Sequence, residues 1–509
     1  MDVQLRRGDV TTRPAGALAL GILEGTTTLT GAAAAVDRAS RGAIRSLLAR
    51  RDFTGRFLEI AVIYPRGVRA QRVILVGLGR RAALDASRVR RASALAARRA
   101  RELGAGTLVT VANGGGDGGL DPERAAQATA EGVLLGHYRF TSYRRDPGPG
   151  ALRRIEVLER DATRARSLAP AVARGARWAE AVCLARDLVN TPGQDLVPER
   201  LAARAREIGR TAGARVETLA VPQLERLGMG ALLAVGRGSV HPPRLIVLDH
   251  PAPRASARAR AGTHAPAPGT VVLIGKGVTF DTGGISIKPR ENMHRMKYDM
   301  AGAGAVLGVF SALPTLDLPF RVVGIIPSAE NMPGGRALKP GDVVRSMDGT
   351  TIEVTNTDAE GRLLLADALG YARRFAPAAV VDLATLTGAI TLALGSLAAG
   401  LFTGDDALAA ELSVAAEASG ERVWRMPLWD DYAPEMRSDI ADILNSSVRE
   451  GGACLAAIFL KRFAEGLPWA HLDIAGMAWA SVERPHEPRG GTGWGVRLLL
   501  EWLSRRATG

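Results

Sequence analysis

The chain has 509 residues, enough for two or three domains, and its 47% hydrophobic and 23% charged residues are ordinary for a soluble globular protein. Its net charge is +14. Its two cysteines, Cys183 and Cys454, cannot form a disulfide framework, which excludes a disulfide-rich scaffold and favours a reducing compartment. The first nine residues contain no apolar segment like that of a secretory signal, so we expect a cytoplasmic protein.

Residues 1–165 are predicted to form a small N-terminal α/β domain. Short apolar runs alternate there with helical patterns rich in Ala and Arg, and this alternation is typical of α/β domains. Strands are predicted at 57–63, 72–77 and 107–111, and helices at about 80–102 and 122–136. No catalytic motif occurs in this part of the chain.

A long helical pattern follows and ends at a stop signal, Asn190-Thr191-Pro192-Gly193. We expect residues 166–192 to form a connecting helix and residues 193–509 to form a larger α/β domain, with a mixed central sheet flanked by helices. Its strands are predicted near 230–235, 244–248, 270–275, 320–326, 378–383 and 470–474. Residues 251–269, rich in Pro, Ala and Arg, are predicted to be a surface insertion.

The segment 356–363, Asn-Thr-Asp-Ala-Glu-Gly-Arg-Leu, is the most informative part of the sequence. It follows a β-branched run, 351–355, and precedes a helical pattern, so a strand should end and a helix begin there. In an extended segment, side chains two positions apart leave the same face, so Asp358 and Glu360 can converge. Converging carboxylates repel each other unless a cation lies between them, and the segment therefore predicts a metal.

A second cluster begins after the predicted strand at 270–275 and contains Lys276, Asp281, Lys288 and Asp299. The chain has 61 Arg but only five Lys, and three of these lie between positions 276 and 297. An amine can lose its proton near a dication and coordinate it, whereas a guanidinium cannot. Chance and a solvated loop are the alternative, which we favour for the three other lysines, Lys297, Lys339 and Lys461.

Three motifs therefore follow predicted strands: Lys276, the segment 356–362 and the segment 385–388. Open α/β sheets bind ligands at the carboxyl ends of their strands, so we expect the motifs to meet at one sheet edge. Asp281, Asp299, Asp358 and Glu360 carry four negative charges, which two divalent cations would balance. A structural cluster of ion pairs is the alternative.

These residues resemble the signature of the leucyl aminopeptidase family of two-metal aminopeptidases. The resemblance continues through the segments 382–389, 469–476 and 491–495, and it covers roughly positions 180–505. It implies that Asp281 and Glu360 bridge the two metals, that Lys276 and Asp299 complete one site, and that Asp358 completes the other. The metals would be Mn²⁺ or Zn²⁺, with Mg²⁺ also compatible, and a hydroxide bridging them would be the nucleophile.

The resemblance also implies roles for residues that do not bind metal. Lys288 would polarise the scissile carbonyl and stabilise the charge that forms on it. Arg362 would hold a bicarbonate ion as proton shuttle, with the backbone of Gly361 and Leu386 as its partners. This suits a chain without an obvious general base, since its seven histidines are scattered and show no His-Glu-x-x-His spacing.

The implied substrates are peptides with a free N-terminus, whose α-amine would bind a metal and Asp299. Small or apolar residues would line the side-chain pocket, so leucine and similar residues should fit. The implied substrate-binding residues are Met296, Asn356, Thr385, Gly388 and Ala475. For Met296, packing in the core is the alternative. By the same resemblance we expect a homohexamer.

A protein of a different class, one that binds DNA, remains as an alternative. Residues 1–300 contain 48 Lys and Arg against 27 Asp and Glu, and residues 301–509 contain 18 against 25, so the halves carry +21 and −7. The basic half indicates possible non-specific DNA binding, as in an architectural or regulatory protein with a secondary peptidase site.

Residues 383–402 are uncharged over the length of a membrane span, but Gly, Thr and Ser interrupt them. We therefore predict buried strand, loop and helix, and no membrane contact.

Overall fold

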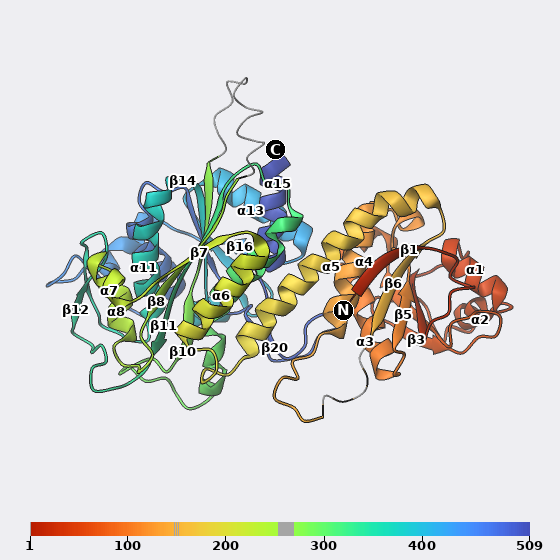
Figure 1. The fold of residues 1–509 in the computed structure, drawn as a ribbon, viewed down its shortest axis with the longest axis horizontal. Coiled ribbons are helices and arrows are strands. Elements are labelled where there is room, and N and C mark those ends of the chain that lie inside the picture. The colour runs from red at the N-terminus through yellow and green to blue at the C-terminus, as the bar shows by residue number, and fades with distance from the viewer. Residues whose placement is uncertain (1, 147, 149, 151, 253–268, 509) are drawn as a thin grey trace, which may run out of the picture. The chain divides into compact units, whose positions relative to one another are not determined.

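The computed structural model describes residues 2–146, 148, 150, 152–252 and 269–508. By its contacts the chain divides into two compact units: unit 1 contains residues 1–183 and 482–489, and unit 2 contains residues 184–481 and 490–509. The long helix α5, Ala162–Asn190, runs from unit 1 into unit 2 (Figure 1).

Unit 1 is built on a six-stranded sheet in the order β1-β6-β5-β2-β4-β3. All neighbours are parallel except β3 and β4. The strands are β1 Asp2–Arg7, β2 Ala17–Leu23, β3 Ile60–Ile63, β4 Val73–Gly79, β5 Thr107–Thr110 and β6 Arg154–Glu159. The helices are α1 Gly31–Ala39, α2 Ala43–Arg50, α3 Ala86–Glu102 and α4 Pro122–His137, and α3 packs against α4.

Unit 2 is built on a mixed nine-stranded sheet in the order β16-β15-β18-β14-β9-β11-β8-β7, with β10 paired to β11. Its central strands are parallel, whereas β7, β8 and β15 each run antiparallel to a neighbour. The strands are β7 Arg215–Leu219, β8 Arg244–His250, β9 Thr270–Gly275, β10 Gly277–Asp281, β11 Val322–Asn331, β14 Pro377–Ala384, β15 Ala399–Phe402, β16 Val423–Arg425 and β18 Trp469–Asp473.

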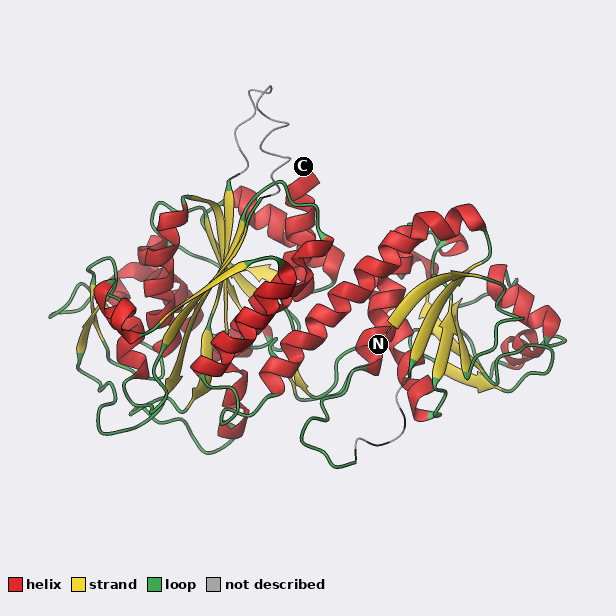
Figure 2. Cartoon of the chain, in the orientation of Figure 1, coloured by secondary structure: helices red, strands yellow, loops and turns green. Residues whose placement is uncertain are grey.

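Helices lie on both sides of this sheet (Figure 2). The helices α10, α13 and α15 pack in one group, and α8, α11 and α14 pack in another, with α10 and α11 both contacting β9. The bounds are α6 Pro198–Ala212, α7 Val221–Arg226, α8 Gly230–Gly236, α10 Ala301–Ala312, α11 Glu360–Ala372, α12 Gly388–Leu394, α13 Asp406–Ser419, α14 Gly452–Ala464 and α15 Val496–Thr508. Two small sheets complete the unit, β12 Val343–Arg345 with β13 Thr351–Glu353 and β17 Ile443–Leu444, and β19 Trp479–Ala480 with β20 Gly490–Gly491.

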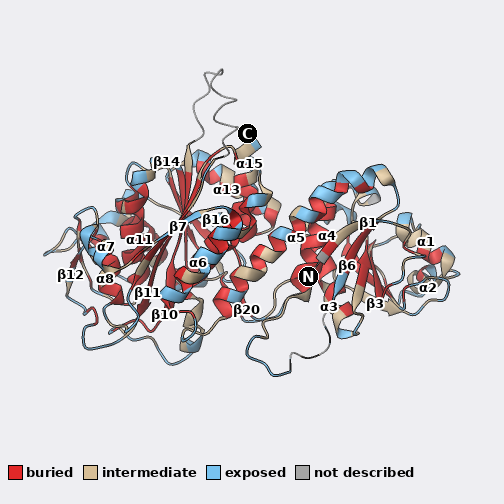
Figure 3. Ribbon diagram, viewed as in Figure 1, coloured by how far each residue is buried: buried red, intermediate tan, exposed pale blue. Residues whose placement is uncertain are grey.

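The core of unit 2 lies between the central strands and the helices on them, where the ribbon is almost entirely buried (Figure 3). The strands β9, β11 and β14 are buried on both faces, which explains why their sequences are mainly apolar. The predicted α/β class, with a mixed and helix-flanked sheet in the larger part, is confirmed.

One predicted strand is wrong: residues 230–235 form the helix α8. Its apolar run, Ala231-Leu232-Leu233-Ala234-Val235, is buried almost throughout, and a short run of this kind does not distinguish a buried strand from a buried helix. In unit 1 the strands β1, β2 and β6 were not predicted, and in the large sheet of unit 2 neither were β7, β10 and β16. The predicted insertion at 251–269 lies almost entirely outside the described residues.

Residues 383–402 contain the end of β14, the helix α12 and the strand β15, and the two strands are buried as expected. The expectation of a core helix is wrong, because Ile390 is the only buried residue of α12. Among the described residues, no helix has both the length and the apolar character needed to cross a membrane.

Candidate metal centre

Lys276 and Asp281 lie at the two ends of the short strand β10. Lys276 occupies the junction between β9 and β10, and Asp281 is the last residue of β10. Asp299 lies in a 3₁₀ helix, Met293–Met300, immediately before α10. Thr385 follows β14, and because β14 pairs with β9, Thr385 lies beside Lys276. These residues meet at one edge of the large sheet, as predicted.

The other carboxylates reach the site by a different route. Asp358 lies in a turn and Glu360 is the first residue of α11, so the two do not share one face of an extended segment. The strand before them, β13, belongs to the small sheet with β12 and β17. All three motifs therefore meet at this edge as expected, but the segment 356–362 reaches it through a turn and a helix N-terminus and not from a strand of the large sheet.

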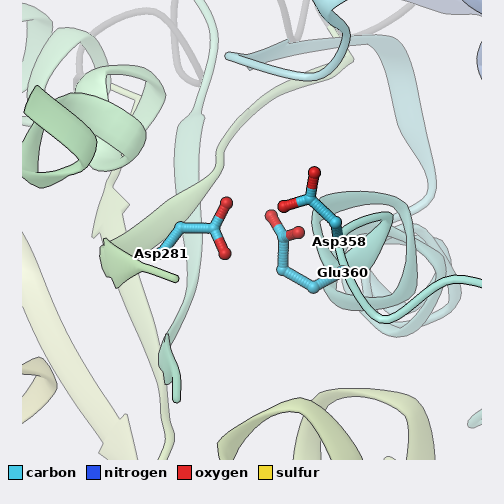
Figure 4. Close-up of side chains that lie close together, drawn as sticks. All are labelled: Asp281, Asp358 and Glu360. Atoms are coloured by element: carbon cyan, nitrogen blue, oxygen red, sulfur yellow. The ribbon is translucent and has the colours of Figure 1, made fainter. Parts of the chain in front are cut away.

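Asp281, Asp358 and Glu360 converge (Figure 4), and one carboxylate oxygen from each lies within 4.8 Å of the others. Asp281 and Glu360 are each only 2% exposed, so water screens their charges poorly. Three negative charges this close require positive charge between them.

Two lysines supply positive charge to the cluster. The Nζ of Lys276 lies 2.8 Å from Asp299 Oδ1 and 2.7 Å from Glu360 Oε1, and it donates to the carbonyl of Thr385 at 2.8 Å. The Nζ of Lys288 lies 2.6 Å from Asp281 Oδ2 and also contacts Asp358 Oδ1. Against four carboxylates these two ammonium groups leave a net charge of −2 in a largely buried site.

The excess negative charge is visible in the pKa values. Burial, followed by the charge of Glu360, raises the pKa of Asp281 to about 6. Burial also raises the pKa of Asp299 well above its usual value, although Lys276 opposes it. For Glu360, burial is outweighed by Lys276 and Lys288, which hold its pKa below the usual value.

The residues present fit divalent metal ions. Oxygen donors with excess negative charge are the ligands that hard divalent cations prefer. The buried Oδ2 of Asp299 accepts no hydrogen bond from the described residues, although Oδ1 of the same carboxylate is bound by Lys276 and by the Thr385 hydroxyl at 2.6 Å. An acceptor that is buried and unpaired is costly, and a cation would satisfy it.

Two residues outside the motifs predicted from the sequence, Asn331 and Asn445, help to hold the ligand segments in place, together with Thr357 of the segment 356–363. Asn331, the last residue of β11, donates to Asp281 Oδ1 at 2.8 Å and to the carbonyl of Thr357 at 3.0 Å, and it thereby joins the two ligand segments. Thr357 donates to the carbonyl of Gly283 at 2.6 Å and accepts from the amide of Ser286 at 2.8 Å. Only the position of Asn331, at the end of a central strand, could have indicated a role.

Asn445 is fully buried and binds the backbone of the segment that carries Asp358 and Glu360. Its Nδ2 donates to the carbonyl of Asn356 at 2.7 Å, and its Oδ1 accepts from the amide of Thr355 at 2.9 Å. Its own carbonyl accepts from Arg362 at 2.6 Å. Nothing in the sequence pattern around Asn445 indicates this function.

Arg362 is buried on α11, and burial lowers the pKa of its guanidinium to about 10. Apart from its bond to Asn445, its Nε donates to none of the described residues, so donor capacity remains for an anion. Of the two expected backbone partners, Gly361 adjoins it on the helix. The amide of Leu386, however, already donates to Asp473 Oδ1 at 3.2 Å.

The expected substrate-binding residues lie in several segments around the cluster. Thr385 contacts Asp299 directly, whereas Asn356 accepts from the amide of Asp358 at 2.9 Å and so supports a ligand. Gly388 is exposed at the start of α12, with open space where a side chain would extend. Ala475 packs on the small apolar cluster around Ile390, and Met296 is half-buried.

Three other basic residues, His471, Lys339 and Lys461, form structural contacts. His471 is buried in β18, and its Nδ1 lies 2.6 Å from Asp382 Oδ1. Lys339 and Lys461 form ion pairs at 3.0 Å with Asp342 and at 2.6 Å with Asp430, outside the cluster.

Comparison with known proteins agrees with this site. Residues 183–500 match the model of the cytosol aminopeptidase family, catalytic domain, and residues 19–147 match that of its N-terminal domain. A probable cytosol aminopeptidase of Roseiflexus castenholzii is 48% identical over 89% of this chain and 91% of its own. Another, from Geobacter sulfurreducens, is 43% identical over 99% of both chains.

Two solved structures have the same fold over nearly the whole chain. The bottromycin maturation enzyme BotP is 41% identical, with a TM-score of 0.83 over 97% of this chain and 100% of its own. It is also known in complex with Mn. A mutant of tomato leucine aminopeptidase is 34% identical, with a TM-score of 0.86 over 99% of this chain and 96% of its own.

The fold and its acidic, lysine-containing site define a metal-dependent aminopeptidase, a hydrolase of peptides. The chain belongs to the cytosol aminopeptidase family, and the resemblance found in the sequence is confirmed. The matched families and relatives give no support to the alternative of a DNA-binding protein.

Proposed function

We propose that this enzyme releases leucine and other apolar residues from the N-termini of peptides with two divalent metal ions bound per chain. The convergence of Asp281, Asp358 and Glu360 within 4.8 Å, beside the buried Lys276 and the half-buried Lys288, carries this proposal. Two bound metal ions explain the excess negative charge of this buried site better than a structural cluster of ion pairs does.

The proposed metal ligands are Lys276, Asp281, Asp299, Asp358 and Glu360. When bound, the metals supply a water-derived nucleophile at neutral pH and polarise the substrate carbonyl. Lys276 is surrounded by Asp299 and Glu360, which raise the pKa of its amine despite burial, so metal binding must compete with a proton on Nζ. Mn²⁺ and Zn²⁺ are the metals we propose, with Mg²⁺ a weaker candidate for the nitrogen ligand.

Lys288 is the proposed electrophilic group. Its Nζ is held between Asp281 and Asp358 and is less buried than that of Lys276, with 21% of the side chain exposed against 3%. A charged group at the open side of the cluster can donate to an oxygen of the substrate and stabilise the negative charge that develops there.

Arg362 is the proposed holder of a bicarbonate ion that takes up and returns a proton. Its unused donors support this role, and the backbone of Gly361 and Leu386 would complete the anion site. Because Leu386 donates to Asp473 through a bond of 3.2 Å, the anion must share or displace that bond. We therefore expect the bicarbonate to be held loosely.

The exopeptidase specificity is proposed to arise from Asp299, whose Oδ2 can accept from the α-amine of a substrate. Met296, Asn356, Thr385, Gly388 and Ala475 are the proposed substrate-binding residues. The open space beyond Gly388 and the small side chain of Ala475 suit a branched apolar side chain such as that of leucine.

The purified protein should be assayed on leucine p-nitroanilide after exhaustive chelation and after addition of Mn²⁺, Zn²⁺ or Mg²⁺. We expect activity to disappear with the metal and return with it, and Asp358→Ala and Glu360→Ala to remain inactive. Full activity in protein shown by elemental analysis to lack metal would refute the two-metal site.

We also propose that the protein is a cytoplasmic homohexamer. Large apolar side chains are exposed on unit 2, among them Leu392 (91%), Leu397 (66%) and Ile440 (67%), and subunit contacts would remove them from water. Sedimentation velocity would test the proposal, because a stable monomer at micromolar concentration would contradict it.

Non-specific DNA binding is a second candidate function, because the two units differ in net charge. Unit 1 contains 33 Lys and Arg against 19 Asp and Glu, a net charge of +14, whereas unit 2 contains 33 of each and is neutral. A gel shift with duplex DNA over a range of salt would test it, since each neutralised phosphate adds about 0.9 to the log–log salt slope. No shift at low salt would leave this candidate without support.

A further inference from the structure

Unit 1 contains a basic cavity of about 180 Å³ whose lining residues all belong to that unit. Six arginines contribute to its wall: Arg98, Arg101, Arg139, Arg144, Arg484 and Arg489. They come from three places in the chain, namely α3, the segment after α4, and the segment 482–489. None of them takes part in the metal centre.

The positive charge of this cavity is only partly neutralised. Arg98 lies 3.1 Å from Glu102 and 3.0 Å from Glu483, and Arg484 lies 2.9 Å from Glu487. When these three carboxylates are set against the six arginines, a net charge of +3 remains around the cavity.

Arg101 and Arg139 carry most of the unbalanced charge in the half-buried part of the wall. Arg101 donates to the carbonyls of Gly136 and His137, at 3.2 and 2.8 Å, which fixes its position without neutralising it. Arg139 forms no ion pair with a carboxylate in the described part of the chain. Exposed Arg144 and Arg489 lie at the rim.

Neighbouring groups respond to this potential. Burial, followed by the charges of Arg139 and Arg98, lowers the pKa of Arg101. Burial, followed by Arg101, lowers the pKa of His137 to about 4, so that this imidazole stays neutral. Further positive charge is unfavourable here, and an anion would be stabilised.

We propose that this cavity binds a compact phosphate-bearing anion, such as pyrophosphate or the diphosphate group of a small organic molecule. Several guanidinium groups around one cavity match phosphate oxygens, which they bind through paired and charge-assisted hydrogen bonds. The size limits the ligand, because pockets for drug-sized molecules have volumes of roughly 300–1,000 Å³. The concave wall fits a compact group rather than an extended duplex backbone.

The test is isothermal titration of the metal-loaded protein with sodium pyrophosphate at constant ionic strength. Arg139→Glu should weaken pyrophosphate binding about tenfold or more, as expected for losing a hydrogen bond to a charged group. The matched control is Arg50→Glu, an equal charge change at an exposed position in α2 of the same unit. Binding of pyrophosphate to the metal centre is common to the parent and both variants. A difference in pyrophosphate affinity between these proteins therefore measures binding to the cavity.

A second titration with a nucleoside diphosphate distinguishes the sources of the phosphate. Binding of both ligands, each lost in Arg139→Glu, assigns the cavity to diphosphate groups in general, whereas binding of pyrophosphate alone assigns it to the free anion. Arg144→Glu, at the exposed rim, serves as a second variant if Arg139→Glu does not fold.

Equal pyrophosphate affinity in the parent and a folded Arg139→Glu protein would overturn the proposal. So would an equal loss in Arg50→Glu, or duplex DNA binding that is tighter than pyrophosphate and unaffected by Arg139→Glu, since both indicate a diffuse surface charge. Circular dichroism and the melting temperature serve as the folding control, and aminopeptidase activity should be unchanged because the proposed metal ligands all lie in unit 2.

Discussion

Gly361 lies so close to Lys276 that a methyl group on its Cα would come within 2.8 Å of the lysine Nζ and Cε. Lys276 is itself fixed by Asp299, Glu360 and the carbonyl of Thr385. The glycine in the segment 356–363 is therefore required by the space that a buried lysine occupies, and not by its own backbone angles.

Gly361→Ala should displace Lys276 and weaken metal binding, with a loss of activity of about tenfold or more if one ligand moves out of position. The helix itself should not suffer, since alanine favours helix over glycine by about 1 kcal/mol. Metal content and kcat should therefore fall while the melting temperature holds. Gly370→Ala in the same helix is the control, because its methyl group would meet Met347 at an ordinary 3.6 Å.

Lys288→Ala should lower kcat by about a hundredfold, the scale of losing one group that stabilises a developing oxyanion. Lys288→Arg should restore little, because a planar guanidinium does not replace a compact ammonium group. Steady-state kinetics on leucine p-nitroanilide would measure both. If Lys288→Ala changed only KM, the proposed role would be wrong.

Asp473 should act as a positioning residue for the pocket. Its Oδ1 accepts from the amides of Leu386 and Ala475, both at 3.2 Å, and its Oδ2 accepts from the Thr387 hydroxyl at 2.6 Å. Asp473→Ala should lower kcat/KM about tenfold through KM, as expected for losing buried hydrogen bonds, without loss of metal.

Asp473→Asn is the matched variant, because an amide oxygen can still accept from both backbone amides. It should recover most of the activity. A normal KM in Asp473→Ala, or loss of bound metal on elemental analysis, would contradict a role limited to the pocket.

The buried His137 should make the protein less stable in acid. Its folded pKa of about 4 lies below its usual value of 6.5, so the unfolded chain binds more protons between these values. Stability is therefore complete above about pH 6.5 and is lost as the pH falls toward 4. His137→Gln should remove this part of the dependence, seen as a smaller change in melting temperature than the parent shows between pH 4.5 and 7.

The sequence was most informative about the site at positions where only one type of side chain can perform the required chemistry. Lys276, Asp281, Asp299, Asp358 and Glu360 all lie in one cluster in the structure, because charged groups in apolar surroundings are rarely accidental. The backbone conformation that brings Asp358 to the cluster was not predicted from the sequence, because it is a turn and not a strand. The sequence pattern shows which residues bear charge, but not the loop geometry that brings them together.

The supporting residues were missed for a related reason. Asn331 and Asn445 act through hydrogen bonds to segments distant in sequence, and an asparagine between apolar residues has no pattern that reveals its partner. The helix α8 shows the same limit in the core, because its apolar run suits a buried helix as well as a buried strand.

The hydrogen bonds of Asn445 also bear on how related chains can differ in metal affinity. Its side chain is bound to the backbone of residues 355–359 and to the Thr355 hydroxyl, and its carbonyl holds Arg362. A shift of the loop between η6, Asp430–Met436, and α14 would therefore move the ligand-bearing turn with it. Changes of length or sequence in that loop offer a way to adjust metal affinity while every metal-binding side chain stays the same.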